Sequence, residues 1–165
     1  MEKTIYSFPI WKVIRTTKYK DVTDVERLLK QRGCQIGAWA NSIICNPNFT
    51  SEQNQKVKLV AVSGYDLGFT KAVSRTDIYK RAIDDFNLGL SLPGDSVDLR
   101  SSYLDQPNEE MRLMAMEPIK DPKGLPYLLV LKHDDYGLWL IAYHDRPGYN
   151  WGPGVIWIFR RRKGS

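Results

Sequence analysis

The chain has 165 residues, of which 24 are Lys or Arg and 19 are Asp or Glu, and its formal net charge is +5. Hydrophobic residues make up 42% of the sequence and aromatic residues 12%, which excludes a disordered chain. Two Cys are too few for a disulfide scaffold, and no apolar run approaches the roughly 20 residues that span a bilayer. We therefore expect a single domain, residues 1–165, ending in a basic tail, 160–165, with no membrane association, no signal peptide and a cytoplasmic location.

The first third of the sequence predicts a strand followed by two helices. Residues 5–16 are rich in Ile, Val and aromatic side chains, as expected of a strand, and the proline within them places this strand at a sheet edge or delays its start. Asp21 or Thr23 then caps a helix whose apolar residues recur at helical spacing as far as Gly33. A second short helix follows and ends before Pro47.

The middle of the sequence alternates between strand and helix patterns. Residues 56–62 alternate two sets of side chains and predict a strand with neighbours on both sides. A third helix is expected from Ser74 to Gly89, because a capping residue precedes apolar residues at helical spacing. Residues 97–103 and 110–116 favour two further strands.

The last third predicts a hairpin and a final strand. Residues 127–133 and 138–144 are two apolar runs joined by the turn sequence Asp-Asp-Tyr-Gly, and this connection places Tyr127 opposite His144. Residues 155–162 predict the last strand. The expected fold is therefore α+β, with about three helices, mostly N-terminal, and a largely antiparallel sheet of five or six strands, mostly C-terminal.

The positive charge is concentrated at the two ends of the sequence. Residues 1–20 contain five Lys and Arg but only one acidic residue, and residues 160–163 are all Lys or Arg. The interior, 21–159, is left with a net charge of −3. If the first and last strands lie side by side, their basic residues form one patch that can contact several phosphates. If they do not, these residues are a solubilising tail and an ordinary solvated strand.

The loop at residues 145–154 combines Gly and Pro with aromatic and basic side chains. Tyr149 and Trp151, with Arg146 nearby, offer the ring faces and the cation that hold single-stranded nucleic acid. The alternative is that the Trp side chains pack on the sheet, because most Trp residues of a small domain lie in its core. The sequence favours packing over a stacking platform.

The Cys and His residues do not have the spacing of a metal site. Ten residues separate Cys34 from Cys45, and ten separate His133 from His144, whereas structural zinc sites have two to five. In the expected hairpin the two His lie on the order of 20 Å apart, too far to share a metal or to act as an acid–base pair on one phosphate. No nucleophile-elbow, phosphate-loop or dinucleotide-binding motif occurs. We therefore expect no metal and no cofactor.

A series of short motifs in fixed order resembles a family of small uncharacterised bacterial proteins, often met in metagenomic genomes. These motifs are LGFT (67–70), IYKRA (78–82), LGLSLP (88–93), LRSSYLDQP (99–107), AMEPI (115–119), GLWL (137–140) and WIFRRRK (157–163), and the opening segment 13–40 is similar as well. The family has Cys-Pro after the LGL stretch where this chain has Ser91-Leu92-Pro93, so no role for a Cys transfers. The resemblance implies one intact bacterial domain and no particular activity, cofactor or catalytic residue.

These patterns favour a non-enzymatic binding domain whose partner is nucleic acid or another protein. The alternative is a small hydrolase or transferase that uses His133 or His144 with a carboxylate. A homo-oligomer in which an edge strand pairs across a two-fold axis is also left open. The residues predicted to bind the partner are Lys12, Arg15, Arg146, Tyr149, Trp151, Arg160, Arg161, Arg162 and Lys163.

Overall fold

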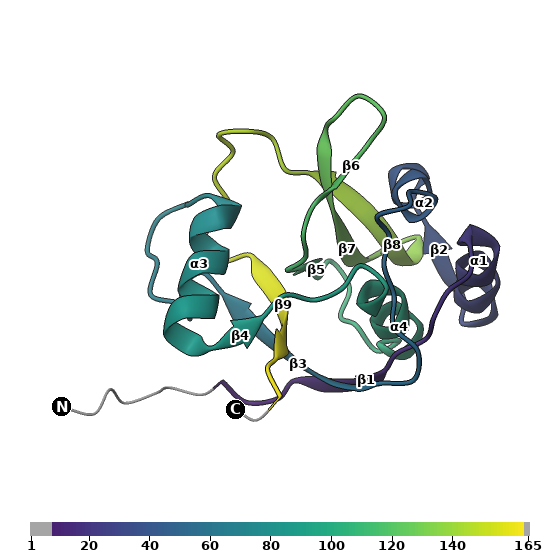
Figure 1. Ribbon diagram of the computed structural model, residues 1–165, viewed down its shortest axis with the longest axis horizontal. Helices are drawn as coiled ribbons and strands as arrows, with labels where there is room; N and C mark the ends of the chain where they lie inside the picture. Colours follow the sequence, from purple (N-terminus) through teal and green to yellow (C-terminus); the bar gives the residue numbers. More distant parts are fainter. Residues whose placement is uncertain (1–7, 164–165) are drawn as a thin grey trace.

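The computed structural model describes residues 8–163, whose core is one sheet of nine strands flanked by four helices (Figure 1). Residues 5–7 of the expected first strand, Lys3 among the N-terminal charges, and Gly164 and Ser165 of the tail lie outside the described residues. No helix within 8–163 is long and apolar enough to cross a bilayer. The strands are β1 (Lys12–Arg15), β2 (Cys34–Ile36), β3 (Lys56–Ser63), β4 (Leu88–Gly89), β5 (Met111–Met114), β6 (Ile119–Lys120), β7 (Pro126–Asp134), β8 (Gly137–His144) and β9 (Ile156–Arg161).

Seven strands follow one path across the sheet, in the order β1–β3–β9–β5–β7–β8–β2, while β4 pairs with β9 and β6 with β7. The pairs β5–β9 and β2–β8 are parallel and the other pairs are antiparallel. The sheet curls into a half-barrel (Figure 1). The expected fold, with five or six mostly C-terminal strands in a largely antiparallel sheet, is therefore wrong. The sheet is mixed, and its strands come from the whole chain.

The missed strands are too short to show an alternating pattern. β2 has three residues, and β4 and β6 have two each. Each is held by pairing with a longer strand, β8, β9 and β7 respectively, so tertiary contact decides its conformation. The expected division into early helices and late strands fails for this reason, because β2 and β4 lie directly after helices.

The structure has four helices among the described residues, where about three were expected: α1 (Val22–Gln31), α2 (Ala38–Ile44), α3 (Arg75–Phe86) and α4 (Asp95–Ser102). The first three confirm the helices predicted from apolar spacing. Asp21 caps α1 by accepting a hydrogen bond from the backbone N–H of Asp24, and Ser74 caps α3 in the same way from Asp77.

Helix α4 occupies most of the segment for which a strand was predicted, so that prediction is wrong. Its polar residues are buried along with its apolar ones: Asp95 is 1% exposed and Arg100 is fully buried. A helix that is buried all round shows no apolar stripe, and the sequence therefore lacked the helical signal. Gly94 begins the helix against the loop between α2 and β3, where a Cβ would lie 2.5 Å from the Cβ of Ser51.

Arg100 ties α4 to the β7–β8 hairpin. Its Nη1 donates to Gln106 Oε1 at 2.6 Å and to the carbonyl oxygens of Lys132 and Trp139 at 3.4 and 3.3 Å, and its Nη2 donates to the carbonyl oxygen of Tyr103. Burial lowers the pKa of this guanidinium from its ordinary value. The hairpin itself has the predicted register and pairs Tyr127 with His144, as expected from its turn.

Candidate functional site

Most of the predicted binding residues lie in two different places, at the two ends of β9, while Lys12 and Arg15 lie on β1. Ile156, at the start of β9, lines a cleft together with Arg146, Tyr149 and Trp151. Arg160, Arg161, Arg162 and Lys163, at the other end, line a separate groove. Ile156 and Arg160 are four residues apart along the strand, which corresponds to about 13 Å.

We call the second of these sites the basic groove. It has a volume of about 490 Å³ and is lined by Lys56, Val57, Lys58, Gly89, Leu90, Arg160, Arg161, Arg162 and Lys163. Lys56 and Lys58 were not among the predicted binding residues, although the sequence pattern indicates where they lie. The alternating pattern of residues 56–62 already placed both lysines on one face of a strand with two neighbours.

The first and last strands do not pair with each other, because β3 lies between them. Leu59 of β3 pairs with Lys12 of β1 on one side and with Arg160 of β9 on the other, so these three side chains share one face of the sheet. We call this the inner face. The opposite, outer face carries Lys58, one residue before Leu59, and Arg161, one residue after Arg160.

On the inner face, the two predicted binding residues, Arg160 and Lys12, already have partners within the fold. Arg160 donates from Nε and Nη2 to the carboxylate of Asp95 at 2.6 and 2.7 Å. Its Nη2 also lies 2.6 Å from Oε1 of Glu52, an ion pair without hydrogen-bond geometry. Burial opposes the charged form, but these carboxylates outweigh it and raise the pKa of Arg160 above its ordinary value. Lys12 Nζ lies over the ring of Tyr103, 4.8 Å from its centroid.

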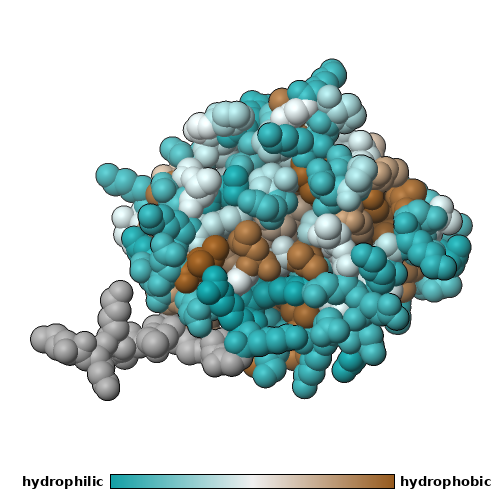
Figure 2. Space-filling model, in the orientation of Figure 1, coloured by the Kyte–Doolittle hydropathy of each residue, from teal (hydrophilic) through white to brown (hydrophobic). Residues whose placement is uncertain are grey.

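On the outer face, Arg15, Lys56 and Lys58 form no ion pair with a carboxylate within residues 8–163. Arg15 pairs in register with Lys56, and its guanidinium donates to the neutral amide of Asn54 at 2.9 Å. Lys56 and Lys58 are both exposed. Arg162 follows the end of β9, lines the basic groove and donates to the amide oxygen of Asn87 at 3.3 Å. Hydrophilic residues accordingly cover the lower side of the molecule in Figure 2, where β1 and the end of β9 lie.

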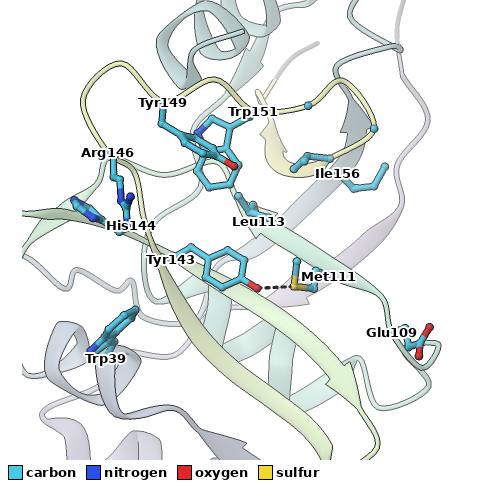
Figure 3. A pocket seen from close by; sticks show the side chains of 13 residues that line it. Trp39, Glu109, Met111, Leu113, Tyr143, His144, Arg146, Tyr149, Trp151 and Ile156 are labelled. Atoms are coloured by element: carbon cyan, nitrogen blue, oxygen red, sulfur yellow. Dashed lines mark hydrogen bonds between the residues drawn. The ribbon is translucent and has the colours of Figure 1, made fainter. Parts of the chain in front are cut away.

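The first site, which we call the aromatic cleft, is larger and differs in character. Its volume is about 740 Å³, and it lies between the start of α2, strands β5 and β8, and the loop 145–155 (Figure 3). Its lining residues are Trp39, Glu109, Met111, Leu113, Tyr143, His144, Arg146, Tyr149, Trp151, Gly152, Gly154, Val155 and Ile156.

Trp151 combines the two roles that the sequence presented as alternatives. It is 6% exposed and packs edge-on against Trp157, with ring centroids 5.5 Å apart, and its Nε1 donates to Asp145 at 3.0 Å. It is therefore a core residue that also forms a wall of the cleft. Tyr149, 48% exposed, stands edge-on to Trp151 at 4.8 Å and presents its ring to solvent.

Neither histidine meets a carboxylate within residues 8–163. Nδ1 of His133 lies 2.6 Å from the backbone carbonyl oxygen of Gln106. His144 stacks on Tyr127 with ring centroids 5.2 Å apart, and its Nε2 is buried without a hydrogen-bond partner in the described part of the chain. The same residues contain no group of three or more His, Cys, Asp or Glu side chains that could hold a metal ion. The geometry therefore gives the hydrolase or transferase alternative no His–carboxylate pair.

The fold and its sites define a small domain of helices and a curled mixed sheet, with a cationic groove and an aromatic cleft. Comparison of the chain with family models, curated proteins and solved structures gives no match.

Proposed function

We propose that the protein is a non-catalytic binding domain that holds the phosphate backbone of nucleic acid in the basic groove and on the adjoining outer face of β1 and β3. The observation that carries this proposal is the convergence of cations from three separate segments. Arg15 comes from β1, Lys56 and Lys58 from β3, and Arg161 to Lys163 from the end of β9. Several phosphates spaced along a chain would each meet a cation there.

The arrangement favours a polyanion over a single small anion. The cations are spread along three neighbouring strands, which lie about 4.8 Å apart, so they form a band and not one enclosed pocket. The side chain of Arg15 donates to the neutral amide of Asn54, which leaves its positive charge in place. An acidic segment of a protein is the other partner that a cationic band would attract, and the experiment below separates the two.

The test is the salt dependence of binding to a short fluorescein-labelled single-stranded DNA, followed by anisotropy between about 50 and 200 mM salt. We expect binding that weakens steeply over this range. The double variant Lys56→Ala/Lys58→Ala removes two phosphate contacts and reduces the slope of log K against log salt by about 1.4. The matched control is Lys30→Ala/Lys123→Ala, which removes the same charge from exposed positions on α1 and in the β6–β7 turn.

Three outcomes contradict the proposal. One is the absence of DNA binding at about 50 mM salt. Another is an equal change of slope in the Lys56/Lys58 variant and in the Lys30/Lys123 control. The third is displacement of the DNA by polyglutamate at charge concentrations equal to those of competing DNA, because this would identify an acidic protein segment as the preferred partner.

A further inference from the structure

We propose that the aromatic cleft is a second, independent site, which binds a small planar anion. The flat ring of the ligand lies between Trp39 and Tyr149, and its carboxylate or phosphate group pairs with Arg146. This site shares no residue with the basic groove.

The size of the cleft suits a small molecule. Its volume of about 740 Å³ lies within the range of roughly 300 to 1,000 Å³ that is usual for small-ligand sites. Its lining is mainly aromatic and aliphatic, with a few polar groups at the ends, which is the composition of such sites. A macromolecular partner would instead require a broad, flat surface of about 800 Å² on each side.

The rings on the two sides of the cleft are exposed and yet held in place. Trp39 is 62% exposed, although its ring packs against Tyr127 with centroids 5.7 Å apart. Tyr149 is fixed from the other side by the buried pair of Trp151 and Trp157. Rings that are already positioned bind a flat ligand without a large loss of side-chain entropy. In Figure 3, Trp39 and Tyr149 lie on opposite sides of the cleft.

The charge in the cleft is asymmetric and is positive at one end. Arg146 is exposed and forms no ion pair or side-chain hydrogen bond within residues 8–163. The adjacent carboxylate, Asp145, cannot neutralise it, because its oxygens accept from Arg75 at 2.7 Å and from Trp151 at 3.0 Å. The cleft's own carboxylate, that of Glu109, lies at the opposite end (Figure 3).

A second hydrogen-bonding group lies at the Arg146 end of the cleft and has no partner in the described residues. Nε2 of His144 is buried and has no partner in the described residues, although His144 lines the cleft. A buried polar atom without a partner is costly. A guanidinium binds carboxylate and phosphate groups in the same planar, two-pronged manner, so the structure specifies the shared chemistry of these two anions.

The test is titration with adenosine monophosphate, as a phosphate-bearing ring, and with indole-3-acetate, as a carboxylate-bearing ring, followed by the indole N–H resonances of the five Trp residues. We expect at least one of the two ligands to shift the signals of Trp39 and Trp151 but not those of Trp11 and Trp139, which lie outside the cleft. Adenosine and indole lack the charge, and inorganic phosphate lacks the ring. We expect each of the three to bind at least about tenfold more weakly than the ligand that carries both.

Two variants and their matched controls complete the experiment. Arg146→Gln should weaken binding about tenfold or more, whereas Arg27→Gln on α1 should not. Tyr149→Ala should weaken binding to a similar degree, whereas Tyr136→Ala, at an 83% exposed position in the hairpin turn, should not. All four side chains are at least partly exposed, so each variant is expected to fold, and the indole spectrum of the free variant checks this directly.

The proposal is overturned if neither anion shifts Trp39 and Trp151 at millimolar concentration, or if the uncharged rings bind as well as the anions. It is also overturned if the Arg146 variant binds like the wild type, or if the same two signals move with protein concentration alone, which would show a second copy of the chain in the cleft. DNA binding in the basic groove is unaffected by any of these results, so the two sites are tested separately.

Discussion

The two faces of the β1–β3–β9 part of the sheet carry the same kinds of charged residue and use them differently. On the inner face, Arg160 is bound by Asp95 and Lys12 lies over aromatic rings. On the outer face, Lys56 and Lys58 are exposed without an ion pair in the described chain. Arg160 and Arg161 are successive residues of β9 and point to opposite faces, so these two cations do not act as one block of charge.

This difference separates residues that hold the fold together from residues that are available to a partner. Proximity along the chain does not distinguish the two faces, since Arg160 and Arg161 are neighbours in sequence and point to opposite faces. The strand register does distinguish them, because it determines whether a cation faces helix α4 or faces solvent. Three changes test the division, in order of decreasing effect.

The largest effect is expected at Arg160. Arg160→Met leaves the carboxylate of Asp95, which is 1% exposed, without its partner and should reduce the free energy of unfolding by about 3–5 kcal/mol, as measured by urea denaturation. Adding Asp95→Asn should recover a large part of this loss, because it removes the unpaired charge. Lys163→Met should change stability by less than about 0.5 kcal/mol. Equal effects at Arg160 and Lys163 would contradict the division between the faces.

A smaller effect concerns Asp98, the other buried carboxylate of α4. Burial raises its pKa from the ordinary value of 3.8 to about 6, although Tyr19 donates a hydrogen bond to it at 2.5 Å. The folded state therefore holds this proton more tightly than the unfolded state. The contribution of Asp98 to stability is greatest in its protonated form at low pH and is lost as the pH rises from about 4 to about 6.

The corresponding variant is Asp98→Asn, which cannot ionise. When the pH is raised from about 4 to about 7, the wild type loses the stability that the proton on Asp98 provides, and the variant does not. The unfolding free energy of the variant should therefore rise by about 2 kcal/mol relative to that of the wild type. Urea denaturation of both proteins at the two pH values gives this difference directly. If the difference in unfolding free energy between the two proteins is the same at both pH values, Asp98 titrates as an ordinary exposed carboxylate. The buried side of α4 then accommodates charge without a cationic partner.

The smallest effect is expected at Lys12. Lys12→Met keeps the aliphatic contact but removes the cation from above the rings of Tyr103 and Trp11, which lie 4.8 and 5.6 Å away. The expected loss is about 0.5–1 kcal/mol of stability, with no change in the salt dependence of DNA binding. A change of salt slope as large as that expected per lysine in the Lys56/Lys58 variant would place Lys12 among the nucleic-acid ligands and weaken the distinction between the faces.

Local patterns in the sequence predicted the regular elements well. The capped helices at Asp21 and Ser74 and the hairpin register of Tyr127 with His144 are confirmed, because each depends on interactions within one short stretch. Helix α4 and strands β2, β4 and β6 could not be predicted in this way. Their conformations depend on burial and on pairing with segments distant in sequence.

The candidate sites show the same limit. The sequence singled out Tyr149, Trp151 and the terminal cations as residue types, but it could not show that they belong to two separate sites. Trp39 and Lys56 join those sites only through tertiary structure, from α2 and β3. The position of β3 between β1 and β9 answers whether the basic ends lie side by side: they are one strand apart.

The row formed by Lys12, Leu59 and Arg160 also has a consequence for chain connectivity. It places the beginning of β1 level with the end of β9, about 10 Å away across β3. Because an extended residue spans about 3.5 Å, a short designed connection could join these two strands, and the exposed turn at Asp121–Gly124 could supply new termini. In such a circular permutant β9 would be followed directly by β1, so two of the three strands that carry the outer-face cations would be consecutive along the chain.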